Sequence, residues 1–190
     1  MMLVSREDLR AFLSRLDGAI DRPADLMLVG GSAMLVLSDE AVATKDLDAF
    51  PTETLDVLIE ALEGPGEVEW KLDLNTASAA FETYLPEDWQ DRIKISREFS
   101  TEKIRISTPS PEDLAVMKIF RFAAKDADDI ERLARTADFD ADAFRERFTR
   151  TLPVAIGEPI THAMSFCLAW NALYPDQRID FEDLLAECGL

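Results

Sequence analysis

The sequence has few of the residues on which several common kinds of site depend. Its 190 residues include two cysteines, Cys167 and Cys188, and one histidine, His162. The cysteines lie far apart and do not show metal-binding spacing, which argues against a zinc site or a disulfide framework and favours a reducing compartment. A single histidine leaves little material for a histidine-based catalytic triad. We expect His162 to be packed or partly exposed on a helix rather than catalytic.

Glycine and long apolar runs are also scarce. The chain has 7 glycines and 47% hydrophobic residues, so it can bury a proper core and shows no bias toward disorder or a fibre. No segment is long and apolar enough to span a bilayer. Near the N-terminus Leu9, Phe12, Leu13 and Leu16 recur at helical spacing, which indicates an amphipathic helix rather than a signal peptide. We therefore expect a cytoplasmic protein without a membrane segment.

Basic residues are the third shortage. Acidic residues outnumber basic ones by 38 to 20, giving a formal charge of −18. Such a field repels polyanions, so extensive wrapping of nucleic acid is not expected. Some of the basic residues cluster in two stretches, 92–105 and 118–125. These stretches fit either a local anion site or an ordinary solvated face.

The hydrophobic pattern of the first part of the chain predicts strands and helices in alternation. Residues 26–29 form a short apolar run that Gly30 and Gly31 close, which is typical of a buried strand that turns into a helix. Residues 44–50 and 68–74 alternate apolar and polar side chains, as half-buried strands do. A further strand is expected at 103–106, and a helix between 52 and 62.

A different pattern begins at Ser110, where a helix N-cap is followed by Pro111 in the first helical position. Helices are then expected over residues 126–134, 140–148, 158–173 and 180–186. We therefore predict an α/β fold with two parts. Residues 1–109 would form a small mixed sheet with flanking helices, and residues 110–190 a helical C-terminal region that packs on this core.

The pair Asp46 and Asp48 is the central chemical feature of the sequence. Residues two apart on a strand project to the same face, so the two carboxylates would lie side by side. Mg²⁺ joins such carboxylates and prefers one or two of them together with substrate phosphate oxygens. Asp73, on another half-polar strand, could supply a third ligand or accept the proton of an attacking hydroxyl. Alone, the pair fits solvated surface carboxylates as well.

Gly30, Gly31 and Ser32 lie shortly before this pair, at the expected turn from strand to helix. The backbone N–H groups and the dipole of a helix N-terminus favour a phosphate, and glycine lets a ligand approach the backbone. Taken alone, the three residues fit an ordinary tight turn equally well. In combination with the aspartates they favour a site that holds a phosphate next to a metal ion.

In order and in structural context, these motifs resemble the polymerase-β-like nucleotidyltransferase superfamily. The segments VGGSAMLVL, ATKDLDAF and SPEDLAVMKIFRFAAKDADDIERL are most similar to AbiEii-type nucleotidyltransferases of bacterial toxin–antitoxin systems. The resemblance covers roughly residues 26–136. It implies that Asp46, Asp48 and Asp73 bind two Mg²⁺ ions when nucleotide is present. It also implies nucleotide contacts from a set of small and basic residues: Gly30, Gly31, Ser32, Lys45 and Lys118.

The reaction that this resemblance implies is transfer of a nucleoside monophosphate from an NTP to a hydroxyl acceptor. The acceptor would be an RNA end, a protein or a small molecule, and an antitoxin protein would be a further partner. Two other interpretations stay open. The first is a catalytically silent module of the same fold that binds a nucleotide or a protein, and the second is an acidic interaction protein that neutralises a basic partner.

Overall fold

A computed structural model describes residues 4–38, 44, 47–63, 74–75, 84–123, 125–136 and 138–190. The chain divides into two compact units. The first contains Met1–Ser78 and Ile93–Pro109, and the second contains Ala79–Arg92 and Ser110–Leu190. The second unit therefore includes residues 84–92, which the sequence pattern had placed with the sheet.

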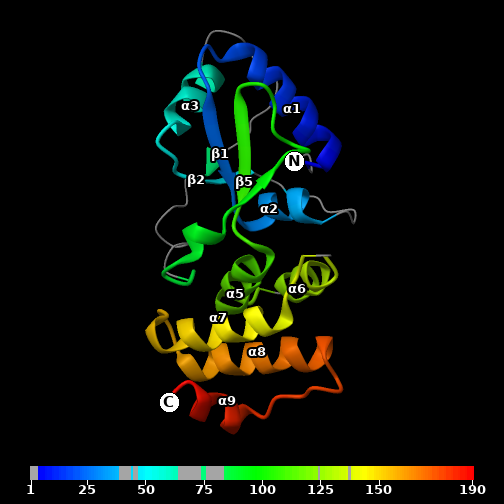
Figure 1. Cartoon of the computed structure of the whole chain (residues 1–190), viewed down its shortest axis with the longest axis vertical. Coiled ribbons are helices and arrows are strands. Elements are labelled where there is room, and N and C mark those ends of the chain that lie inside the picture. The colour runs from blue at the N-terminus through cyan, green and yellow to red at the C-terminus, as the bar shows by residue number, and fades with distance from the viewer. Residues whose placement is uncertain are drawn as a thin grey trace. The chain divides into compact units, whose positions relative to one another are not determined.

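The first unit is built on a small mixed sheet, which confirms the predicted fold class. Strands lie in the order β3-β2-β1-β5-β4, with β1 parallel to β5 and antiparallel to β2 (Figure 1). Strand β3 runs parallel to β2, and β4 runs antiparallel to β5. The elements are α1 (Arg6–Ala19), β1 (Ala24–Leu28), α2 (Gly30–Leu37), β2 (Leu47–Phe50), α3 (Leu55–Glu63), β3 (Leu74–Asn75), β4 (Lys94–Ser96) and β5 (Ile104–Thr108).

One face of this sheet carries the core of the first unit. Leu28 pairs with Ala49 in the β1–β2 register, and both belong to a buried cluster that also contains Phe12 of α1 and Leu58 of α3. Successive residues of a strand point to opposite faces. Leu47 and Ala49 are accordingly buried whereas Asp48 and Phe50 are only partly so. Asp48 thus projects from the sheet face opposite the core, as the alternation in the sequence predicts.

Two local features of the first unit differ in how well the sequence revealed them. Helix α1 begins with a capping box between Ser5 and Asp8 and buries its predicted apolar stripe, because both signals are local. Strand β4, by contrast, was not predicted. Two of its three residues are exposed and the third is only partly buried, so it carries no apolar alternation that could announce a strand.

The second unit is helical, as predicted. Helices α7 and α8 lie side by side, and both pack against α5 (Figure 1). Ser110 caps α5 by accepting a hydrogen bond from the N–H of Asp113, which confirms the predicted start of the helix. The elements are η1 (Trp89–Arg92), α5 (Pro111–Arg121), α6 (Asp126–Ala134), α7 (Ala141–Thr151), η2 (Leu152–Val154), α8 (Pro159–Leu173) and α9 (Phe181–Glu187).

Aromatic side chains fill the core of the second unit. Phe148 stacks on Phe166 with ring centroids 4.1 Å apart, and Phe166 stacks in turn on Trp170. His162 packs edge-on against Phe120, and its Nε2 lies 3.1 Å from the carbonyl oxygen of Ile156. The prediction that His162 is packed is therefore confirmed. Within the described ranges, no helix has the length and apolar character needed to cross a membrane.

Candidate functional site

The Gly-Gly-Ser segment lies where the sequence predicted it, at a turn from strand to helix. Strand β1 ends at Leu28, and α2 begins at Gly30 with Val29 as its N-cap. The side chain of Val29 makes no capping hydrogen bond, unlike those of Ser5 and Ser110 at the starts of α1 and α5. The first N–H groups of a helix have no partner within the helix and favour an anion or a carboxylate.

Two hydrogen bonds join this turn to strand β2. The backbone N–H of Asp48 donates to Oγ of Ser32 at 2.7 Å, and the N–H of Val29 donates to the carbonyl of Asp48 at 2.9 Å. Ser32 is fully buried and Asp48 is half-buried. These contacts place Asp48 directly beside the start of α2, so two motifs that lie sixteen residues apart form one site.

Gly30 makes the closest approach to Asp48. Its φ of +57° lies in the left-handed region, and a Cβ at this position would be 2.7 Å from Oδ2 of Asp48. Glycine is therefore required both by the backbone conformation and by the space that the carboxylate takes up. The close approach that the glycine pair predicted is here made by the protein's own carboxylate.

We expect Gly30→Ala to destabilise the protein by about 1–3 kcal/mol, because alanine adopts a left-handed φ at a cost and its methyl group would collide with Asp48. Gly18→Ala is the matched control. Gly18 lies in α1 with nothing within 4 Å of an added Cβ, so its replacement should leave stability unchanged or slightly raised. Urea unfolding of both variants checks this, and equal midpoints would contradict the geometry at Gly30.

The other two carboxylates of the predicted metal site, Asp46 and Asp73, lie outside the described residues, as does Lys45. The residues that follow the two aspartates, Leu47 and Leu74, are partners in the parallel β2–β3 register. Convergence of the three carboxylates stays a prediction. Among the residues whose positions the structure gives, no group of three or more acidic, histidine or cysteine side chains could hold a metal ion.

Arg6 supports the site from the far end of α2, a role that no pattern in the sequence indicates. Its guanidinium donates to the carbonyl oxygens of Leu35 at 2.9 Å and Ser38 at 2.6 Å, where α2 ends. The guanidinium also lies 4.9 Å from the centre of the Phe99 ring. Cations at a helix C-terminus satisfy its last carbonyls. Arg6 is 29 residues from Leu35, so no local pattern could reveal this contact.

Lys118 lies in the second unit, where it is fully buried in a cluster of ion pairs. Its Nζ is 2.6 Å from Oδ2 of Asp129 and 3.3 Å from Oδ1 of Asp126. Arg121 also binds the carboxylate of Asp126, and Arg132 also binds that of Asp129. Lys118, Asp126 and Asp129 thus hold the end of α5 to the start of α6. Contact of Lys118 with a nucleotide stays a prediction.

The charge state of Asp126 follows from this cluster. Burial of its carboxyl would raise its pKa, but hydrogen bonds from Arg121, the charge of Lys118 and the N–H of Ala123 outweigh burial and hold the pKa below its ordinary value. Asp126 therefore stays ionised in the folded protein. A group with a lowered folded pKa stabilises the fold above its ordinary pKa, and this contribution is lost as the pH falls.

The basic stretch at 92–105 is largely engaged by acidic groups or helix carbonyls. Within the second unit, Arg92 binds Asp113 and Asp88, which raise its pKa although its burial opposes this. In the first unit, Nζ of Lys103 donates to backbone carbonyls at the end of α1, and Arg105 pairs with an aspartate of β1. These contacts favour a structural role over an anion site for the three residues.

The comparisons with known proteins place this site in a family. A family model described as nucleotidyltransferase of unknown function (DUF6036) matches residues 7–177. The chain belongs to this family. The match extends over both units and includes the Gly30 turn, Asp48 and the Lys118 cluster, so the DUF6036 assignment covers the site and not only the sheet. No curated protein and no solved structure shows significant similarity to the chain.

Membership of the DUF6036 family confirms the nucleotidyltransferase part of the resemblance. It does not extend to the AbiEii-type proteins, to a metal or to a substrate. Within the matched residues, the geometry pairs a Gly-Gly-Ser turn with an aspartate-bearing strand. That pairing is the basis of the function proposed below.

Proposed function

We propose that the chain is a metal-dependent nucleotidyltransferase that moves a nucleoside monophosphate from an NTP to a hydroxyl acceptor. The observation that carries the proposal is the contact between Asp48 and the first residue of α2. A Cβ on Gly30 would be 2.7 Å from the Asp48 carboxylate, and Ser32 binds the backbone of the same aspartate. This contact supports the proposal, because it puts the turn that would bind the triphosphate next to a carboxylate that would bind the metal.

The residues present fit a divalent cation in their donor chemistry. Mg²⁺ prefers carboxylate and phosphate oxygens. The carboxylate of Asp48 is half-buried and projects from the sheet face opposite the core. Asp46 and Asp73 would complete the ligand set, and the register of Leu47 with Leu74 supports their placement on adjacent strands. When bound, the cation would supply charge neutralisation for the triphosphate and for the leaving pyrophosphate.

The protein's own residues would bind and position the substrate. Gly31 would let the triphosphate approach the N-terminus of α2, where the helix dipole favours negative charge, while Gly30 leaves the space that the Asp48 carboxylate takes up. Ser32 and Arg6 fix the two ends of this helix. A carboxylate of the aspartate set would accept the proton of the acceptor hydroxyl. Positioning of the substrates and electrostatic stabilisation of the transition state would account for most of the rate enhancement.

The acceptor and the biological setting follow from the family resemblance and from the charge of the chain. The segments quoted above resemble AbiEii-type toxins, which supports an RNA end as acceptor and an antitoxin as partner. A formal charge of −18 disfavours a long nucleic acid and favours a short terminus, a protein hydroxyl or a small molecule. We therefore propose a small or terminal hydroxyl acceptor in a cytoplasmic toxin–antitoxin system, with binding that weakens quickly as salt increases.

Two measurements test this proposal. First, each of the four NTPs is added with Mg²⁺, and the melting temperature is followed. At least one NTP should raise it, whereas an acidic interaction protein with solvated carboxylates would give no shift. Second, transfer from α-labelled NTP to cellular RNA and protein fractions is measured. A shift without transfer would support the catalytically silent nucleotide-binding module, which the burial of Lys118 among carboxylates favours as the second candidate.

A further inference from the structure

The surface of α8 carries an apolar ridge that the packing of the second unit does not use. The side of α8 with Ala163, Phe166 and Trp170 is buried in the aromatic core. Its other side exposes large apolar groups at a spacing of four residues. We call this side the α8 ridge: Ile160 (57% exposed), Met164 (53%), Leu168 (64%) and Ala172. A helix that is apolar on both sides is typical of one buried on both sides.

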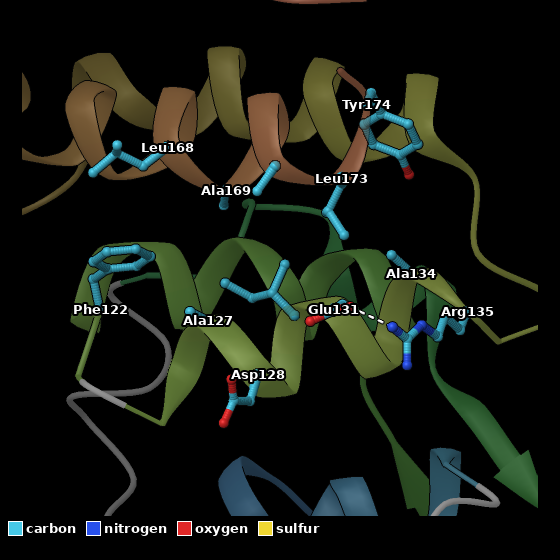
Figure 2. Close-up of a pocket in the computed structure, with 12 residues that line it drawn as sticks. Phe122, Ala127, Asp128, Glu131, Ala134, Arg135, Leu168, Ala169, Leu173 and Tyr174 are labelled. Carbon is cyan, nitrogen blue, oxygen red and sulfur yellow. Dashed lines mark hydrogen bonds and ion pairs between the residues drawn. The ribbon is translucent and has the colours of Figure 1, made fainter. Parts of the chain in front are cut away.

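Hollows lie along both flanks of the ridge. The first, about 540 Å³, runs between α6 and α8, and Figure 2 shows Ala127 and Ala134 of α6 facing Ala169 and Leu173 of α8. The second, about 570 Å³, is lined by Cys167, Asn171 and Phe181 together with ridge residues. Both hollows belong to the second unit alone. A single patch of surface thus presents a protruding row of side chains and the grooves into which such a row fits.

This combination is self-complementary. A two-fold interface uses the same patch on both subunits, so each must supply both a ridge and a groove. Side chains four residues apart form the ridges that pack into the i±4 grooves of a facing helix, which is the commonest geometry of helix packing. The α8 ridge, together with the grooves that α6 and α9 line beside it, meets this requirement.

The charged residues that line the two hollows favour a second copy of the chain over a basic partner. The whole chain carries −18, which opposes self-association in general and would attract a basic partner. The two hollows, however, are lined by as many arginines as carboxylates: Asp128, Glu131, Arg135 and Arg178. Glu131 and Arg135 already pair with each other, and Asp128 points away from the groove (Figure 2). A patch without an excess of carboxylates offers little to a basic partner and lets two acidic chains meet.

We propose that the α8 ridge is the interface of a two-fold symmetric dimer of this chain, in which the ridge of each copy lies in a groove of the other. Sedimentation equilibrium of the full chain should then give the dimer mass at micromolar concentration. The melting temperature should rise with protein concentration, as it does for associating folds. Added salt should tighten the dimer, because it screens repulsion between two chains of charge −18.

Leu168→Glu is the decisive variant, because it places a carboxylate at the centre of the ridge. The dissociation constant should increase by more than about tenfold, since burial of unpaired charge is costly. Leu168 is exposed, so the circular dichroism spectrum should not change. The matched control is Val154→Glu, at an 80% exposed residue that lines a different hollow with Leu85 and Arg150. It should remain dimeric.

Three results would overturn the proposal. The first is a wild-type chain that stays monomeric at all concentrations and salt levels. The second is a dimer that Leu168→Glu leaves intact, because this would place the interface elsewhere. The third is an association that weakens with salt, which would indicate contacts between opposite charges rather than the apolar ridge.

Discussion

Replacing Asp48 by asparagine is expected to abolish metal-dependent nucleotide transfer while the fold stays intact. Asparagine keeps the shape of the side chain and removes the charge that would hold Mg²⁺. Charge stabilisation by a bound metal contributes several kcal/mol to a transition state, so transfer should fall by about 10³-fold or more. Asp46→Asn should have the same effect.

The matched control for this experiment is Asp56→Asn. Asp56 lies in the first turn of α3 in the same unit, and its exposed carboxylate pairs with Arg22 on the surface. Its replacement removes the same charge and should leave transfer unchanged. Equal loss of transfer in both variants would indicate a general effect of charge and would contradict a special role for Asp48.

Melting curves separate catalysis from helix capping. The carboxylate of Asp48 lies against the first residue of α2, where it also interacts favourably with the helix dipole. If the aspartates converge, their repulsion without metal offsets that gain, so the metal-free Asp48→Asn protein should melt close to the wild type or slightly above it. A clear drop in metal-free stability, with no effect of Mg²⁺ on the wild type, would make Asp48 a structural cap instead.

The second large effect is expected at Lys118. Lys118→Met should destabilise the fold by about 3–5 kcal/mol, because it leaves two carboxylates without the ammonium group that holds them in a fully buried position. Lys125→Met is the control. Lys125 is an exposed lysine at the N-cap of α6, so its loss should change stability by less than about 0.5 kcal/mol.

A double variant and a pH series sharpen this test. Lys118→Met combined with Asp129→Asn should recover part of the loss, because the second change removes one of the uncompensated charges. Asp126 has a lowered pKa in the folded protein, so the cluster stabilises the fold above the ordinary value of 3.8 and loses this effect in acid. Stability should therefore fall less steeply with acid in the Lys118→Met protein than in the wild type.

The same series tests the nucleotide contact predicted for Lys118 from the family resemblance. If Lys118 has only the structural role of holding α5 to α6, Lys118→Met should be less stable than the wild type at every NTP concentration. If Lys118→Met loses NTP binding but unfolds at the wild-type denaturant midpoint, the structural role is contradicted and a direct phosphate contact is supported.

Local signals account for what the sequence predicted correctly. The alternation around Asp48, the turn at Gly30 and the N-cap at Ser110 each depend on neighbouring residues, and the structure places them as expected. The missed features depend on long-range contacts or on weak patterns. Arg6 reaches the end of α2 across 29 residues, and β4 has too little buried surface to show alternation.

Lys118 shows why a residue pattern does not fix a role. A lysine beside a helix end and an aspartate pair fits both phosphate binding and an internal ion cluster, since both need a cation near the end of α5. The choice depends on burial, which arises only when α6 folds back on α5. The Gly30–Asp48 contact has the same origin, because strand pairing brings together motifs that are separate in the sequence.

Transfer of label from an α-labelled NTP in the presence of Mg²⁺, with the wild type and Asp48→Asn side by side, tests the central claim most directly. The proposed function predicts labelled product with the wild type, none above background with Asp48→Asn, and none with either protein when the metal is chelated. Equal product from both proteins, or none from a wild type that binds NTP with Mg²⁺, would contradict it.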